Sequence, residues 1–249
     1  GIGNFGMAGT FPIPAFSISL EDGIDLLAQL GLDPALQDIM GLLPAQDLIS
    51  DFSSAGPAND YSLKPDITAP GDAVLSTVPE ADGLFAVLGG TSMASPHVAG
   101  GAALLKQKYG DQLSVEEYKA LLMNTSFLLY DREDNKYPVT VQGAGVLDMY
   151  AAGWSRGLAL PASISLRVDG TENTVTVRNL SDEEITYEIE FVSDTLAAEY
   201  PEEITVPAKS TEEFVIAFDL ADLDEGHHEG YVVLIPTTDV IVQIGRAHV

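Results

Sequence analysis

Two stretches in the middle of this 249-residue chain carry the apolar spacing of helices. The run Thr91–Tyr109, followed by a glycine, predicts one long helix. A second helix is predicted from Ser114 to about Asn124, since Ser114 and Glu117 have the spacing of a capping box.

After Trp154 the apolar period changes from about 3.6 residues to 2, which predicts strands. Four such runs lie between turn-forming residues: Thr174–Val177, Ile185–Phe191, Phe214–Phe218 and Tyr231–Ile235. Short strands at this spacing favour a β-sandwich over residues 158–249. Near the other end, residues 11–18 predict a strand and residues 23–30 a helix. The chain therefore divides into residues 1–45, 46–157 and 158–249.

Charge narrows the range of partners. The chain holds 38 Asp plus Glu against 11 Lys plus Arg, a formal net charge of −27. Such a surface repels nucleic-acid phosphates and anionic lipid head groups, so neither is an expected partner; it also keeps a secreted protein dispersed.

Residues 84–105 lack charged side chains, but glycines, Ser92 and Pro96 at their centre argue against a membrane-spanning helix. The absence of cysteine excludes disulfides and thiolate metal sites.

The candidate chemistry lies in residues 89–100, Gly-Gly-Thr-Ser-Met-Ala-Ser-Pro-His-Val-Ala-Gly. The glycine pair permits a sharp turn that places Ser92 in the first turn of a helix, where backbone N–H groups lack partners and the helix dipole is positive. An oxyanion formed at Ser92 is then stabilised by the backbone N–H of Ser92. Taken alone, Ser92 also fits an N-terminal cap on a helix of small packing residues.

The eleven residues Gly90–Gly100 resemble the serine-bearing signature of the subtilisin-like serine proteases, the subtilases. Three further segments are similar to that family in the same order: residues 52–57 (FSSAGP), 63–71 (LKPDITAPG) and 142–148 (QGAGVLD). The resemblance implies an α/β fold in which residues 46–157 form the C-terminal half of a parallel-sheet catalytic domain.

The flanking regions resemble one branch of the family, the cell-envelope proteinases that include lactocepin and streptococcal C5a peptidase. Residues 1–45 are similar to the end of a protease-associated domain, and residues 158–249 to a truncated fibronectin type III-like β-sandwich. The last residues, 244–249, look like a translated sequencing adapter or an extension of the final strand.

The resemblance implies a secreted or cell-envelope serine endopeptidase that cleaves protein or peptide substrates through an acyl-enzyme on Ser92. Thr91, Met93 and the Gly89–Gly90 turn shape the surroundings of Ser92. The family's Asp, His and oxyanion Asn precede Gly1 in this branch, so we expect residues 1–249 alone to be inactive. No cofactor is assignable, although the resemblance admits structural calcium in the whole protein.

No histidine of the chain is expected to serve as the general base. His97 lies about 140° around the helix from Ser92. His227 and His228 fall in a predicted turn and His248 in the tail. The acidic loop 131–135 could offer calcium ligands, but an intervening arginine and the lack of a central glycine favour a polar hairpin loop.

Two other sequence features and two rival functions stay open. Asn124 and Asn179 each begin an N-glycosylation sequon. A pseudoprotease or cell-surface adhesion module is one alternative function, in which the fold persists without catalysis. A different serine hydrolase is the other, but a nucleophile elbow requires a glycine where Ala94 stands.

Overall fold

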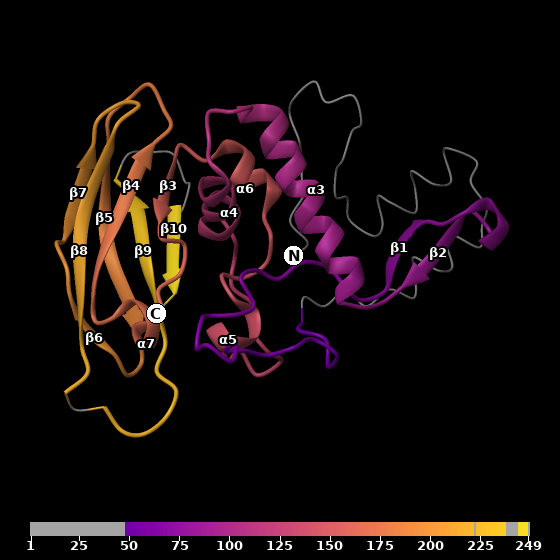
Figure 1. Ribbon diagram of the computed structural model, residues 1–249, viewed down its shortest axis with the longest axis horizontal. Coiled ribbons are helices and arrows are strands. Elements are labelled where there is room, and N and C mark those ends of the chain that lie inside the picture. The colour runs from indigo at the N-terminus through magenta and orange to yellow at the C-terminus, as the bar shows by residue number, and fades with distance from the viewer. Residues whose placement is uncertain (1–47, 222, 238–243, 249) are drawn as a thin grey trace.

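The computed structural model describes residues 48–221, 223–237 and 244–248. The strand and helix predicted within residues 1–45 lie outside the described residues. Figure 1 shows three regions along the molecule: a projecting β-hairpin, a group of helices, and a two-sheet β-structure. Within the described ranges, no helix has the length and apolar character needed to cross a bilayer.

Both predicted helices are observed. α3 runs over Thr91–Tyr109 and α4 over Val115–Asn124. The predicted capping box is formed, since Ser114 Oγ accepts the N–H of Glu117 and the Glu117 carboxylate accepts the N–H of Ser114. Three shorter helices were not predicted: α5 (Val139–Gln142), α6 (Met149–Trp154) and α7 (Leu166–Asp169).

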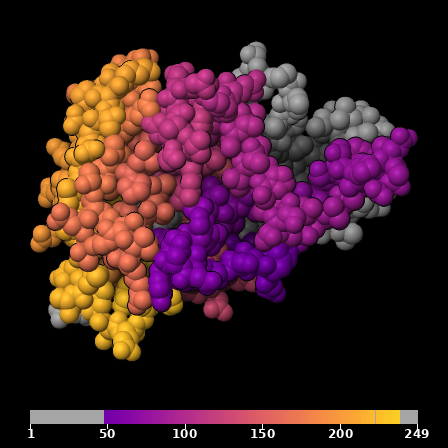
Figure 2. All heavy atoms as spheres, in the orientation of Figure 1, coloured from indigo at the N-terminus to yellow at the C-terminus, as the bar shows by residue number. Residues whose placement is uncertain are grey.

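Strands before α3 form the hairpin that projects from the helices (Figures 1 and 2). β1 (Val74–Thr77) pairs antiparallel with β2 (Phe85–Leu88), and a single 3₁₀ turn at Glu80–Asp82 lies in the loop between them. The implied parallel sheet is represented among the described residues by one parallel bridge, between Thr68 and Val146.

Over the described part of residues 157–248, the predicted β-structure consists of two four-stranded sheets in which neighbouring strands are antiparallel. One sheet has the order β3-β4-β8-β6 and the other β10-β9-β5-β7. The strands are β3 (Gly157–Leu160), β4 (Glu172–Asn179), β5 (Ile185–Ser193), β6 (Ala197–Glu199), β7 (Glu203–Val206), β8 (Thr211–Asp219), β9 (Gly230–Pro236) and β10 (Ile244–His248). All four predicted runs lie within observed strands.

Alternation of side chains explains how the sheets pack. In β8, Phe214, Ile216 and Phe218 are buried, whereas Val215 is 47% exposed. Buried residues of β4 and β8 meet those of β5, β7 and β9 in one apolar core. The sandwich predicted from the period of 2 is therefore the observed architecture of this region.

A second apolar core joins the helices to the sandwich. It contains Leu105 of α3, Leu121 of α4, Ala152 of α6 and Leu158 of β3. The helices that support the Ser92 segment therefore pack directly against the first strand of the β-structure.

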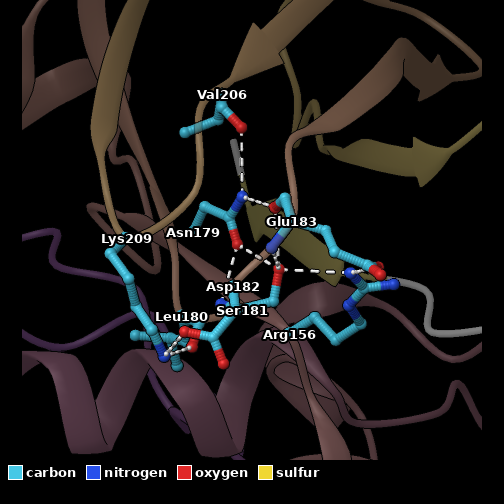
Figure 3. A network of polar contacts seen from close by, with 8 residues as sticks. All are labelled: Arg156, Asn179, Leu180, Ser181, Asp182, Glu183, Val206 and Lys209. Atoms are coloured by element: carbon cyan, nitrogen blue, oxygen red, sulfur yellow. Dashed lines mark hydrogen bonds and ion pairs between the residues drawn. The ribbon is translucent and has the colours of Figure 1, made fainter.

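Figure 3 shows the polar network at the turn between β4 and β5, close to the connection from the helices. The Asn179 amide donates to the carbonyl oxygens of Glu183 and Val206, at 2.7 and 3.0 Å, and its oxygen accepts from Ser181. Arg156 donates to the Glu183 carboxylate at 2.6 Å. Asn179 and Asn124 are each only 1% exposed, so neither sequon presents its amide for glycosylation in the folded chain.

Candidate active site

A tight turn carries the chain from β2 into α3 and exposes Ser92. Gly90 has φ 146°, a left-handed backbone conformation that favours glycine. Its N–H donates to the carbonyl of Gly71 at 2.7 Å, and its carbonyl accepts the N–H of Met93 at 2.9 Å. The turn is thus fixed from both sides. Ser92 is the second residue of α3 and is exposed to solvent.

The surroundings of Ser92 suit a nucleophile. The first backbone N–H groups of an α-helix have no partner within the helix, and the helix dipole places partial positive charge there. When Ser92 Oγ bonds to a carbonyl carbon, the oxyanion that develops on that carbon can therefore be stabilised by the N–H of Ser92. Within the described part of the chain, Ser92 Oγ makes no hydrogen bond, so the hydroxyl is free to meet a base and a substrate.

Behind Ser92, α3 is supported by close packing on α6. A Cβ added to Gly101 would lie 2.5 Å from the sulfur of Met149, so this glycine lets the two helices approach. Only Gly101 and Leu105 of α3 are buried among the described residues. Figure 2 shows α3 at the surface of the molecule, between the hairpin and the sandwich.

The segment that precedes the nucleophile turn is held by hydrogen bonds and ion pairs. Thr68 donates its N–H to Gly145 and accepts from Leu147, both at 2.8 Å. Gly143 approaches this segment so closely that an added Cβ would lie 2.4 Å from the carbonyl oxygen of Pro65. Gly143 of the QGAG motif therefore permits the close contact between these two distant segments.

Asp66, in the same segment, is bound by two lysines. Lys64 Nζ lies 2.6 Å from one carboxylate oxygen and Lys119 Nζ 2.8 Å from the other. Partial burial raises the pKa of Asp66, but the hydrogen bonds and charges of Lys119 and Lys64 outweigh it, and the net effect is a lowered pKa. Asp66 is thus ionised and ties α4 to the approach to Ser92.

The two histidines whose ring contacts the structure gives, His97 and His228, bind groups other than Ser92. His97 Nδ1 is 2.8 Å from the carbonyl oxygen of Met93, so its ring is hydrogen-bonded to the backbone of its own helix. His228 lies in the loop before β9, with ring nitrogens 3.0 Å from Thr195 Oγ1 and 2.8 Å from the Asp224 carbonyl oxygen. Within residues 48–221 and 223–237, no imidazole hydrogen-bonds to Ser92.

The acidic loop at residues 131–135 is the predicted hairpin loop. Tyr130 and Lys136 form an antiparallel bridge at its base. One Asp131 oxygen accepts the N–H groups of Glu133 and Asn135, at 2.8 and 2.9 Å. This carboxylate oxygen therefore satisfies the backbone of its own turn. In the ranges that the structure describes, no group of three or more His, Asp or Glu side chains is arranged to hold a metal ion.

Sequence reasoning missed one charged residue at the nucleophile turn. Asp72 follows Gly71, whose carbonyl accepts the Gly90 N–H, and one Asp72 carboxylate oxygen lies 3.0 Å from where a Cβ on Gly89 would stand. No local sequence signal marks Asp72, because the contact joins residues 17 positions apart along the hairpin.

Comparison with known proteins identifies the family. The model of the subtilase family matches residues 25–153. The chain belongs to the subtilase family. The recognition made from the serine-bearing string and its three accompanying segments is therefore confirmed, and Ser92 lies within the matched region.

This subtilase is similar to several curated proteases. It is 34% identical over 215 residues to the minor extracellular protease Vpr of Bacillus subtilis (strain 168), covering 80% of this chain and 27% of that protein. It is 30% identical over 244 residues to the C5a peptidase of Streptococcus pyogenes serotype M1, covering 86% of this chain and 20% of that protein. It is 36% identical over 170 residues to the PII-type proteinase of Lactococcus lactis subsp. cremoris, covering 59% of this chain and 9% of that protein.

These relatives are cell-envelope and extracellular subtilases, the branch that the flanking segments indicated. The chain spans about a quarter or less of the length of each of them.

Proposed function

We propose that Ser92 is the nucleophile of a secreted or cell-envelope serine endopeptidase. The observation that carries the proposal is the exposure of Ser92 in the first turn of α3, behind the Gly90 turn, within a subtilase sequence. Protein or peptide substrates fit this assignment, and the named relatives are proteases.

In the proposed reaction, Ser92 Oγ attacks the carbonyl carbon of a peptide bond and its proton passes to a histidine base. The bond between carbon and nitrogen then breaks, the histidine protonates the leaving amine, and water hydrolyses the acyl-enzyme. The Ser92 N–H stabilises the oxyanion. We assign the base, its aspartate and a second oxyanion donor to residues outside those described here, since no described imidazole meets Ser92.

The domain assignment is part of the proposal. Residues 46–157 form the C-terminal part of the catalytic domain, and residues 1–45 the end of a protease-associated domain. The two-sheet region is a fibronectin type III-like sandwich, supported by its two antiparallel four-stranded sheets. We propose that this sandwich holds the catalytic part in place through the apolar core they share.

The test uses the full-length protein that contains this chain. Ser92→Ala is expected to lower peptidase kcat by at least about 10⁴-fold and to abolish labelling by a fluorophosphonate probe. Ser76→Ala, an exposed serine of β1, is the matched control and is expected to keep both. Peptidase activity that survives Ser92→Ala contradicts the assignment. A wild-type protein without activity or labelling favours the pseudoprotease or adhesion alternative.

A further inference from the structure

Asp72 stands at the base of the hairpin, next to the nucleophile turn. The hairpin begins at the pair Val74–Leu88, and just outside it Asp72 lies beside Gly89. The hydrogen bond from Gly90 N–H to Gly71 O, 2.7 Å long, fixes the backbone on both sides of this contact. The Asp72 carboxylate oxygen, 3.0 Å from the Cβ position of Gly89, is therefore held beside the turn.

The Asp72 carboxylate has no partner in the described part of the chain. It is exposed, and neither a hydrogen bond nor an ion pair engages its side chain. The sequence holds no lysine or arginine between Lys64 and Lys106. Lys64 is bound to Asp66 and Lys106 to Asp111, at 2.6 and 2.5 Å. The negative charge of Asp72 is thus left for whatever binds in front of α3.

Gly89 stands three positions before Ser92, so Asp72 lies on the order of 10 Å from the reacting hydroxyl by chain reach. A peptide bound for attack by Ser92 is extended, at about 3.4 Å per residue. A long side chain within about three residues of the scissile bond can therefore reach the carboxylate. An ammonium or guanidinium group there is attracted, and a carboxylate is repelled.

We infer that Asp72 is a specificity-determining residue that favours substrates with a basic side chain close to the scissile bond over those with an acidic one. The inference rests on the proposed peptidase function of Ser92. The charge acts on substrate choice, because Asp72 takes no part in bond making. Its contribution is electrostatic and solvent-exposed, so added salt weakens it.

The test measures kcat/KM of the full-length protein on matched peptides. Each pair carries Lys or Glu at one position within three residues of the scissile bond, and the Lys-to-Glu ratio is compared between variants. At the position that faces residue 72, Asp72→Asn is expected to lower the ratio about three- to tenfold, and Asp72→Lys to lower it further. Asp82→Asn, the same charge change at the far tip of the hairpin, is expected to leave the ratio unchanged.

A measurement on wild-type protein keeps the inference falsifiable if a variant fails to fold. Raising the salt concentration from about 0.05 to 1 M is expected to reduce the Lys-to-Glu ratio at the same position. An active protein whose ratio is unmoved by salt, or by both Asp72 variants, overturns the role of Asp72 and leaves the peptidase assignment standing. Absence of Ser92-dependent cleavage overturns the peptidase assignment and, with it, this inference.

Discussion

Asp66 shows how a single ionised side chain can fix the segment that leads to the nucleophile. Its carboxylate is bound by Lys64 and Lys119, and only 29% of its side chain is exposed. The two lysines keep its pKa below the usual value despite the opposing effect of burial. Stabilisation from a lowered pKa is present above the unfolded-state pKa and is lost as the pH falls through the folded-state pKa.

Asp66→Asn is therefore expected to lower the melting temperature of the full-length protein at pH 7 by about 2–4 °C. The difference from wild type should begin to shrink as the pH falls below about 4, where the carboxylate of the unfolded chain takes up a proton, and should vanish at lower pH, where the folded carboxylate is protonated too. Asp111→Asn is the control, since its ion pair with Lys106 is solvent-exposed and contributes little. Scanning fluorimetry across pH tests this, and an equal loss at pH 3 and pH 7 would argue against the ion pairs as its source.

At the residue scale, the sequence predicted that Ser92 lies in the first turn of a helix and that His97 turns away from it, but not the contacts of Asp72 or Asn179. Ser92 and His97 lie on one helix, whose regular geometry gives their relative positions. The surroundings of Asp72 depend on how two strands of a hairpin meet, and those of Asn179 on a turn whose partner lies on β7. Neither contact follows from local spacing.

Among the elements, α4 and β4 are joined by an ion pair that also belongs to a helix cap. The Glu117 carboxylate closes the capping box with Ser114 and binds Arg178 of β4. Arg178 also donates to the carbonyl of Gln112 at 3.2 Å. A second contact between the helical region and the β-structure joins α5 to the residue before β9. The N–H of Val139, the first residue of α5, donates to both carboxylate oxygens of Glu229, at 2.9 and 3.0 Å.

Arg178→Ala is expected to lower the melting temperature by about 2–4 °C, because it leaves the partly buried Glu117 carboxylate without its cation. The capping box should remain, so the helical circular-dichroism signal of the folded state is expected to be unchanged. Arg132→Ala, an exposed arginine of the 131–135 loop, is the matched control and should melt with wild type. A melting temperature for Arg178→Ala equal to that of the control would show that the contact adds nothing to stability.

Long elements were predictable and short ones were not. α3, α4, β4, β5, β8 and β9 each have seven residues or more, long enough to show a period. β3, β6 and β7 have three or four residues, and α5 has four. The positions of these short elements are determined by the longer strands and helices against which they pack.

For the whole molecule, the exposure of α3 bears on how residues 1–249 behave alone. A 19-residue helix with only two buried residues gains little from packing. Phe85 and Leu88 beside it are 46% and 45% exposed. We expect purified residues 1–249 to associate or to melt without cooperativity, and to show no peptidase activity, since no described imidazole activates Ser92.

Size-exclusion chromatography, a thermal melt and fluorophosphonate labelling of residues 1–249 test this expectation. The matched control is the full-length protein, which should label at Ser92. A monomeric fragment with a sharp cooperative melt would refute the stability part, and cleavage of peptides by that fragment would refute the catalytic part. At this scale the sequence predicted the family and the order of its characteristic segments, because each segment is contiguous in the sequence. It did not predict the packing of β3 on α4, because this contact joins the helical region to the β-structure.

The passage from α6 to β3 takes only Ser155 and Arg156. Ser155 is buried and donates to the carbonyl of Gly157 at 2.6 Å, and Arg156 is held by Glu183. Both residues of this connection are therefore held by hydrogen bonds. We therefore expect a force applied to the sandwich to pass directly into α6 and the helices packed on it, so that the sandwich supports the Ser92 helix rigidly.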